Sequence, residues 1–468
     1  MLAINAFAKT RHRTAGDRAE NILRNMIDYH EQEKILYLEE TGTEYNDVDA
    51  SMNQRKIVTP DTIAYSAVIQ AHANSNSKGS AEKALALLTA VIESNNPSLK
   101  PDAFLFANTI NAYAKSLAKE KSAEKRLEAA ERAEYILWLM IEVFKSSQVS
   151  SSTRTDDDLD NNFAKNFDVN IVPFNACLKA WAQSNTPGSP QRAEDILFKI
   201  LDPECEETKD VKPNTTSFNT CMQAWARNAR TDMGAPQKAE DLLNTLIEQG
   251  VALNIQPDAQ SYTAVMNAYA RSDLIDKATQ SRRVLNLLLS NDYLRSSGEI
   301  SAVPFTVLLN SVAHTDNTHD TKIDISTHMV EFDDSDPYSL ALEAYDELIN
   351  DLHRLDIEPD HLTFAAMLDV IRQHTDSESI ERRQRVENVL KDTCTGGCVS
   401  SLVLKSLFQA CPSPDLLRSL LEVKKPLALE SVNALPREWT RNVPPAFRKL
   451  RRSQEENKRR WKGKKKWH

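Results

Sequence analysis

Amide, hydroxyl and basic side chains recur at four-residue intervals along several segments of the chain, as in Asn219, Gln223 and Arg227. Residues four apart share one face of an α-helix, so each set predicts a polar row along a helix. Amides and hydroxyls donate and accept hydrogen bonds, and basic side chains attract phosphate. This combination favours recognition of a single-stranded nucleic acid over bond-making chemistry. The equivalent rows are Ser66, Gln70 and Asn74; Ala107, Asn111 and Lys115; Asn175, Lys179 and Gln183; Thr263, Asn267 and Arg271; and Thr306, Asn310 and His314. An ordinary wet surface is the alternative, although such a face more often mixes Glu and Lys.

The sequence contains no recognisable catalytic motif. It lacks the H-x-E and P-C-x-x-C pair of zinc deaminases, the phosphate-binding P-loop and the glycine-rich dinucleotide turn. We therefore expect a binding protein with no enzymatic activity and no cofactor. Cys394, Cys398 and Cys411 have no histidine nearby at ligand spacing, so a zinc site there is an alternative that the pattern does not favour.

The composition predicts a helical protein. Only 10 of the 468 residues are glycine, and strong helix formers are abundant. No apolar run approaches the roughly 20 residues of a membrane helix, so we expect no membrane span. The net charge is −10, yet residues 436–468 carry 13 Lys or Arg against 3 Glu. The aromatic residues within this basic tail allow two predictions: RNA contact by charge and stacking, or a disordered solubilising segment.

One helix pattern occurs several times. The segments PFNACLKAWAQSN and SFNTCMQAWARNA keep Phe-Asn, Cys and Ala-Trp-Ala in register. The aromatic residue, Cys and Trp fall on one apolar face, which predicts that Cys177, Cys221 and Trp225 are buried. The aromatic position recurs as Tyr65, Phe106, Phe174, Phe218, Tyr262, Phe305 and Phe364. Its two longest gaps contain polar stretches, which predict insertions near residues 146–168 and 315–336.

A second amphipathic helix follows each first one, with motifs such as RAENIL, RAEYIL, RAEDIL and KAEDLL. One such apolar stripe consists of Ala239, Leu242, Leu243, Leu246 and Ile247. A Pro-Asp or Pro-Asn step commonly precedes the next first helix, where proline ends one segment and Asp or Asn caps the start of another. Helix pairs of this kind bury a continuous core only by stacking. The predicted fold is therefore an all-α solenoid.

These patterns predict four parts of the chain. Residues 1–59 form a partial N-terminal repeat and a linker, because AINAFAKT matches only the end of a first helix. This start indicates either a truncated sequence or a degenerate first repeat that caps the array. Residues 60–410 form the repeat array, residues 411–435 a C-terminal helical cap, and residues 436–468 a basic, disordered tail.

The segments IQPDAQSYTAVMNAYAR, VKPNTTSFNTCMQAWAR and IEPDHLTFAAMLDVIR resemble pentatricopeptide repeats. The resemblance covers roughly residues 1–410, and the tetratricopeptide pattern is not matched in register. It implies stacked antiparallel helix-turn-helix repeats that form a right-handed superhelix and bind single-stranded RNA, one base per repeat. It also implies a mitochondrial or plastid protein that acts in RNA stability, processing or translation. We expect a monomer, with any protein partners held through the acidic loops or the basic tail.

The resemblance implies a role for particular residues as well. The residue after the aromatic, together with the Asp or Asn that closes the repeat, selects the base. The implied pairs are Ser66 with Asp102 for guanine, Asn175 with Asn214 for cytosine, Asn219 with Asp258 for uracil, Thr306 with Asp360 for guanine, and Thr263 with Ser301 for a purine. The pair of Ala107 with Asn170 implies no particular base, and neither does Ala365. The implied base-sandwiching residues are Ile63, Phe104, Val172, Thr216, Gln260 and Val303, and the implied phosphate contacts are Lys9, Lys115, Arg227 and Arg271.

The chain departs from the family in its repeat length. Ordinary gaps between the aromatics run from 41 to 44 residues, longer than the spacing that is usual in the family. The extra length lies in the turns, so helix pairs can still stack. A helical scaffold for protein–protein interaction is the second functional hypothesis, because an acidic chain suits it as well.

Overall fold

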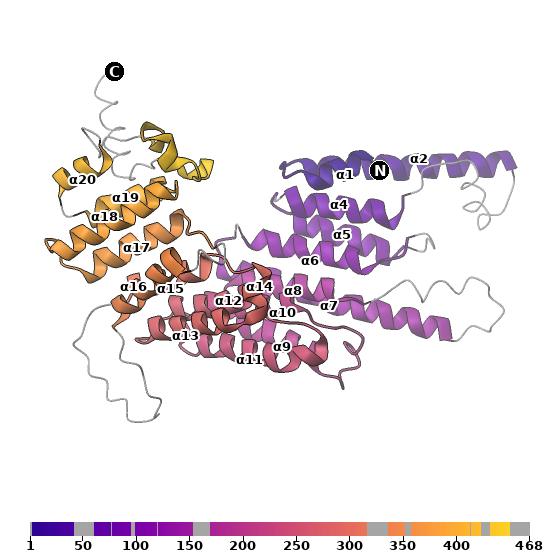
Figure 1. Ribbon diagram of the computed structural model, residues 1–468. Helices are drawn as coiled ribbons and strands as arrows, with labels where there is room; N and C mark the ends of the chain where they lie inside the picture. Colours follow the sequence, from indigo (N-terminus) through magenta and orange to yellow (C-terminus); the bar gives the residue numbers. More distant parts are fainter. Residues whose placement is uncertain are drawn as a thin grey trace, which may run out of the picture. The chain divides into compact units, whose positions relative to one another are not determined.

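The computed structural model describes residues 2–41, 60–75, 77–94, 99–118, 120–152, 169–315, 336–351, 357–411, 413–422 and 431–449. Within these residues the chain is built of helices, and the only β-pairing is an isolated antiparallel bridge between Ser431 and Lys449. The predicted all-α class is confirmed for this described part of the chain (Figure 1).

The chain divides into two compact units, which we describe separately. The first comprises Met1–Asn228 and Asp241–Gln256, and the second comprises Ala229–Glu240 and Pro257–His468. Helix α11 (Ala235–Leu253) contributes residues to both. The other helices of the first unit are α1 (Leu2–Lys9), α2 (Ala15–Thr41), α4 (Thr62–Ser75), α5 (Ser80–Ile92), α6 (Ala103–Leu117), α7 (Ala123–Ser152), α8 (Ile171–Ser184), α9 (Ser189–Leu201) and α10 (Thr215–Asn228). The second unit contains α12 (Ala259–Arg271), α13 (Lys277–Ser290), α14 (Asp292–Ser297), α15 (Val303–Ala313), α16 (Pro337–Asp346), η2 (Glu347–Asp351), α17 (His361–His374), α18 (Ile380–Thr395), α19 (Ser401–Ala410), α20 (Pro414–Leu421), η5 (Val432–Ala434), η6 (Arg437–Thr440) and η7 (Pro445–Phe447).

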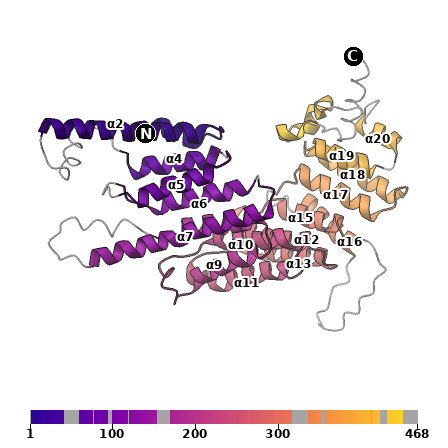
Figure 2. The same ribbon diagram turned by 180° about the vertical axis from the view of Figure 1, so that it is seen from behind.

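Within each unit the helices pack in sequence order. In the first unit the first helices of successive pairs, α1, α4, α6, α8 and α10, pack each against the next. Each second helix, α2, α5, α7 or α9, contacts its own first helix and the following one. In the second unit α12, α15, α17 and α19 form the same succession, with α13 and α16 each contacting the first helices on both sides. Both views show this stacking within the units (Figures 1 and 2).

The Pro-Asp and Pro-Asn steps start first helices as predicted. In each case a side-chain oxygen accepts a hydrogen bond from a backbone N–H three residues later, which satisfies a donor that the helix itself leaves free. The capping residues are Asp61, Asp102, Asn214, Asp258 and Asp360, with distances of 2.8, 2.7, 3.1, 2.9 and 2.9 Å.

The recurring aromatic fills the core of each pair. Phe106, Phe174, Phe218, Phe305 and Phe364 are among the largest fully buried side chains. Each such burial stabilises the fold by about 1.5–3 kcal/mol. The predicted burial of Cys177, Cys221 and Trp225 is confirmed.

The predicted apolar stripe of α11 is wrong at one position. The side chain of Ile247 is 46% exposed, whereas Leu242 and Leu246 are buried. Eight residues after Ala239, a helix that turns about 100° per residue carries the side chain to the edge of the apolar face.

Two predicted boundaries differ from the structure. Helix α7 continues to Ser152, so the insertion predicted from residue 146 does not begin there, and residues 153–168 and 316–335 lie outside the described residues. The predicted disordered tail from residue 436 is wrong for residues 436–449, which form η6, η7 and the bridge at Lys449. Leu435 and Val443 are buried there and Trp439 is partly buried, so this part has its own apolar anchors. Residues 450–468 lie outside the described residues.

Candidate nucleic-acid interface

The residue two positions before each recurring aromatic is exposed in every described first helix that carries that aromatic. The predicted sandwiching residues Ile63 and Phe104 are 63% and 59% exposed, and Val172 and Val303 are 40% and 48% exposed. Thr216 and Gln260 are exposed as well. Leu362, on α17, occupies the same position and is exposed, although the sequence analysis did not single it out. The position of Leu362, two residues before Phe364, could have identified it from the sequence. Five of these seven positions thus carry an exposed large apolar side chain.

A hydrogen bond from the start of a first helix to the segment that precedes the next first helix occurs twice. In the first unit Thr62 Oγ1 donates to Lys100 O at 2.8 Å, and Thr215 Oγ1 donates to Gln256 O at 2.9 Å. Both threonines stand three residues before an aromatic, and both acceptors stand two residues before a capping Asp. In both places a threonine hydroxyl at the start of a first helix thus holds the backbone of the segment that leads into the next one.

One predicted base-selecting pair is in direct contact. Asn175 Nδ2 on α8 donates to Asn214 Oδ1 at the start of α10, at 3.2 Å. Ser217 Oγ donates to Asn175 Oδ1 at 2.7 Å, while Ser217 N donates to Asn214 Oδ1 at 3.1 Å. The cap of α10 and the selecting position on α8 therefore form one hydrogen-bonded group. Asn175 keeps part of its side chain exposed.

A second pair is joined through a hydroxyl. The Oγ1 atoms of Thr306 and Thr363 are 2.8 Å apart, and Thr363 Oγ1 donates to Asp360 Oδ1 at 3.0 Å. Asp360 caps α17, so Thr363 has the position that Ser217 has in α10. Thr306 is buried, which leaves it less accessible than Asn175.

Ser66 and Asp102 are not joined in this way. Ser66 Oγ accepts from Asn108 Nδ2 at 3.0 Å, and Asp102 accepts from Leu105 N at 2.7 Å. The third residue of α6 is Leu105, so no hydroxyl is available there to bridge the two side chains.

The remaining predicted selectors have local partners. Asn219 is buried, and it belongs to the first compact unit, whereas Asp258 belongs to the second. Asp258 forms a capping box with Ser261 at the start of α12. Thr263 Oγ1 donates to Ala259 O on its own helix at 2.6 Å. Ser301, which is exposed, accepts from Val303 N at 3.4 Å.

The predicted phosphate contacts lie at or near the ends of first helices. Lys115 Nζ donates to Asn74 Oδ1 at 2.6 Å, and Asn74 Nδ2 donates to Ala8 O at 2.6 Å. Arg227 Nη1 donates to Ala182 O at 2.8 Å. Lys115 and Arg227 therefore also tie their helices to the preceding ones.

Positive charge gathers around Lys115. Burial lowers the pKa of Lys115, and the neighbouring cations Lys179 and Arg11 lower it further. Mutual repulsion among three cations raises their affinity for an anion such as phosphate. Lys9 and Arg271 are exposed at the ends of α1 and α12.

The sequence analysis missed a set of four glutamates, of which Glu134, Glu194 and Glu240 are buried and Glu20 is partly buried. The glutamate of the RAE or KAE motif on a second helix accepts a hydrogen bond from the residue seven positions after the aromatic on the next first helix. The pairs are Glu134 with Trp181, Glu194 with Trp225, Glu240 with Tyr269, and Glu20 with His72, at 2.9, 3.1, 2.5 and 3.0 Å. The repeated motif was the signal. Its role is structural, because each glutamate joins two successive helix pairs.

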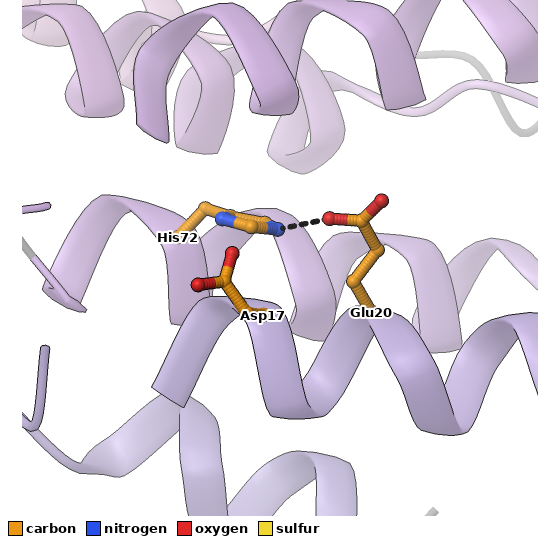
Figure 3. A group of neighbouring side chains, drawn as sticks. All are labelled: Asp17, Glu20 and His72. Carbon is orange, nitrogen blue, oxygen red and sulfur yellow. Dashed lines mark hydrogen bonds and ion pairs between the residues drawn. The ribbon is translucent and has the colours of Figure 1, made fainter. Parts of the chain in front are cut away.

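The Glu20 and His72 pair also lies beside Asp17 (Figure 3). Among the described residues this is the only group of at least three side chains whose potential metal-ligand atoms lie within 4.8 Å of one another. Both carboxylates already face cations, since Lys83 Nζ lies 2.6 Å from Asp17 Oδ1 and Arg24 Nη2 lies 2.5 Å from Glu20 Oε1. A divalent cation would have to displace them, so the geometry favours an ion-paired link between α2, α4 and α5.

The three C-terminal cysteines do not form such a group in the described residues. Burial raises the pKa of Cys394 to about 12 and that of Cys398 to about 11.

No protein-family model matches the chain, and the search of curated proteins also found no match. None of the described helices combines the length and the apolar character needed to cross a membrane.

Proposed function

We propose that this protein binds single-stranded RNA selectively, one base per helical repeat, in organellar RNA metabolism. The observation that carries the proposal is the row of exposed residues before the recurring aromatics, among them Ile63, Phe104, Val172 and Val303. Each belongs to a first helix, and first helices pack side by side within each unit. Stacking of a base on an aromatic side chain such as Phe104 contributes about 1–3 kcal/mol, and the aliphatic side chains of the row offer apolar contact to a base. A row of such positions suits successive bases of an extended strand.

In this proposal each base lies between the exposed residues of two neighbouring first helices. The base read by Asn175 and Asn214 lies between Val172 and Thr216, within reach of both amides. The hydrogen bond between these two amides supports their action as one unit. Cations around Lys115 attract the phosphates, and the proposed α-solenoid keeps the same geometry from repeat to repeat.

The test exchanges Asn214 for Asp. Asp caps the equivalent helices at positions 102, 258 and 360, so the helix start is retained. The resemblance pairs Asn with Asn for cytosine and Asn with Asp for uracil. We expect Asn214→Asp to move the preference at one position of the RNA from cytosine to uracil. Discrimination should reach roughly 1–3 kcal/mol, measured with RNAs that differ at that base.

A matched control is Asn291→Asp. Asn291 also caps a helix, α14, by accepting from Leu294 N at 3.2 Å, but it follows a second helix and closes no predicted pair. This variant should leave the base preference unchanged. An unchanged preference in Asn214→Asp as well would contradict the proposed base reading.

The second hypothesis, a protein-binding scaffold, also has an observation in its favour. Large apolar side chains are exposed on second helices, including Tyr135 on α7, Phe198 on α9 and Val251 on α11. If the purified chain binds no RNA and these side chains are needed to capture a protein partner, the scaffold hypothesis replaces the RNA proposal.

A further inference from the structure

The segment that follows α20 folds back onto α18 and α19. Val399 N donates to Trp439 O at 2.8 Å, Asn442 N donates to Gly397 O at 3.0 Å, and Asn442 Nδ2 donates to Gly396 O at 2.9 Å. Its two ends are joined by the bridge between Ser431 and Lys449. We call residues 431–449 the C-terminal strap. Backbone pairing at several points gives the strap a defined position on the second unit.

A glycine allows this close approach. Gly397 has a φ of +69°, which only glycine adopts at low cost, and a Cβ there would also lie 3.0 Å from the carbonyl oxygen of Glu438. The absence of a side chain in the turn after α18 therefore lets the strap backbone approach closely.

The strap places an exposed aromatic ring at the start of α17. The ring centroid of Phe447 lies 4.6 Å from that of His361, with the two planes at 54°, and Phe447 is 37% exposed. His361 is the first residue of α17 and stands between Asp360, the cap joined to Thr306, and the exposed Leu362. His361 Nε2 is buried and has no hydrogen-bond partner in the described structure. The unpaired Nε2 atom of His361 and the exposed ring of Phe447 thus both lie at the start of α17, which is capped by the predicted base-selecting residue Asp360.

The strap is also cationic. Arg437, Arg441, Arg448 and Lys449 stand against a single acid, Glu438. Arg441 and Arg448 donate to the carbonyl oxygens of Thr395 and Val443, at 2.9 and 3.1 Å, so they are held close to the fold without being neutralised by those contacts. Ordered cations beside an exposed aromatic ring are the combination that binds single strands through phosphate attraction and base stacking.

We propose that Phe447 is an additional stacking platform for a nucleobase, supplied by the strap and not by a repeat. The base stacked there is the neighbour of the base held at Leu362, so the strap extends the RNA path beyond the exposed residue of α17. Lys449 and Arg448 lie on the phosphate side of this nucleotide. The inference rests on the proposed RNA binding, because it needs a strand that already follows the row of first helices.

The test compares three variants, Phe447→Ala, Phe447→Leu and Phe447→Trp, in the full chain. The probe is a randomised, 4-thiouridine-containing single-stranded RNA of about 20 nucleotides, a length that spans the predicted row at one base per repeat. We expect Ala and Leu to weaken binding by about 5- to 150-fold, the loss of one stacked base, and Trp to retain it. Light-induced crosslinks should include the peptide that carries Phe447. Because Leu keeps apolar contact with His361, a loss in both Ala and Leu identifies stacking and not misfolding of the strap.

Two further variants separate this inference from the proposed function. Phe198→Ala removes an equally exposed aromatic from the second helix α9 and should leave affinity within twofold of the unaltered chain. Phe104→Ala removes a predicted sandwiching residue and should weaken binding. Weakened binding in Phe104→Ala with no change in Phe447→Ala would overturn the strap inference alone. Failure of the unaltered chain to bind the RNA pool would overturn the proposed function and the inference with it.

Discussion

Replacing Glu134 by alanine should loosen the first unit at α8. Glu134 accepts four hydrogen bonds: from Trp138 Nε1 at 2.9 Å, Trp181 Nε1 at 2.9 Å, and Arg192 Nε and Nη2 at 3.0 and 2.6 Å. It therefore links three consecutive helices, α7, α8 and α9. Removal of this carboxylate breaks all four hydrogen bonds at once, while the packing of the helices against one another remains.

The expected cost follows from the burial of each donor. Trp181 is buried, so its unpaired Nε1–H costs about 1–3 kcal/mol. The Arg192 side chain is 48% exposed, and water screens its pairing, which leaves about 0.2–1 kcal/mol. Trp138 is only partly buried and can bind water after the change, so we add nothing for it. Together with the lost methylene, of about 0.8 kcal/mol, the total is roughly 2–5 kcal/mol.

Hydrogen exchange of the α8 backbone amides measures this effect locally. In a repeat array, stability depends on interfaces between neighbours, so the loss should concentrate in α7, α8 and α9. A cost of roughly 2–5 kcal/mol corresponds to about 30- to 4,000-fold faster exchange. Glu134→Gln keeps one acceptor and the volume of the side chain, and should cost about half as much.

Glu131→Ala, one turn earlier on the exposed face of α7, is the matched control and should change stability by no more than about 0.5 kcal/mol. If α8 in Glu134→Ala exchanged no faster than in Glu131→Ala, the reasoning from buried donors would be refuted.

Two further predictions concern acid and salt. Burial lowers the pKa of His72 despite the attraction of Glu20 and Asp17, and Lys83 lowers it further, so the folded state binds a proton less readily than the unfolded state. The stability that neutral His72 contributes is complete above its ordinary pKa of 6.5 and is lost as the pH falls through the lower folded value. The protection of the α2 and α4 amides, taken relative to the intrinsic exchange rate at each pH, should therefore fall from about pH 7.5 to pH 5 in the natural chain and fall less in His72→Gln; an equal pH dependence would contradict this assignment. Deleting residues 450–468 removes nine Lys or Arg and should make the slope of log affinity against log salt shallower by about 0.7 for each phosphate that these residues neutralise. An unchanged slope would exclude RNA binding by those residues. The deletion must not extend to residue 437, because it would then remove part of the strap, including Trp439 and Val443.

Local sequence patterns predicted the helices and their starts well, because interactions within a few residues decide both. The four-residue spacing of apolar residues predicted the first and second helices, and the Pro-Asp and Pro-Asn steps predicted their starts, because capping needs only residues within one turn. The family resemblance singled out Ile63, Phe104, Val172 and Val303 as base-sandwiching residues, and these side chains are exposed, while the role itself stays a prediction. The same spacing reaches Leu362.

Contacts between distant residues could not be predicted from spacing alone. Asn175 and Asn214 are 39 positions apart and meet only because α8 packs on α10, whereas Ser66 and Asp102 have a similar separation and no shared hydrogen bond. The two cases differ in the selecting residue, because the amide of Asn175 reaches Asn214 directly whereas the hydroxyl of Ser66 accepts from Asn108, and in the third residue of the following helix, Ser217 in one case and Leu105 in the other. The role of the RAE glutamates was missed for the same reason, since their partners lie on another helix.

The sequence by itself determined that this is a chain of amphipathic helices with one repeated buried face and one repeated polar face. That follows because periodicity and capping act over a few residues and need no partner. Only the tertiary structure decided which polar residues meet across helices, which carboxylates accept from tryptophan or histidine on another helix, and that residues 436–449 belong to the fold. Those outcomes depend on packing between segments far apart in the chain, where a single side chain such as Leu105 or Gly397 decides whether a contact forms.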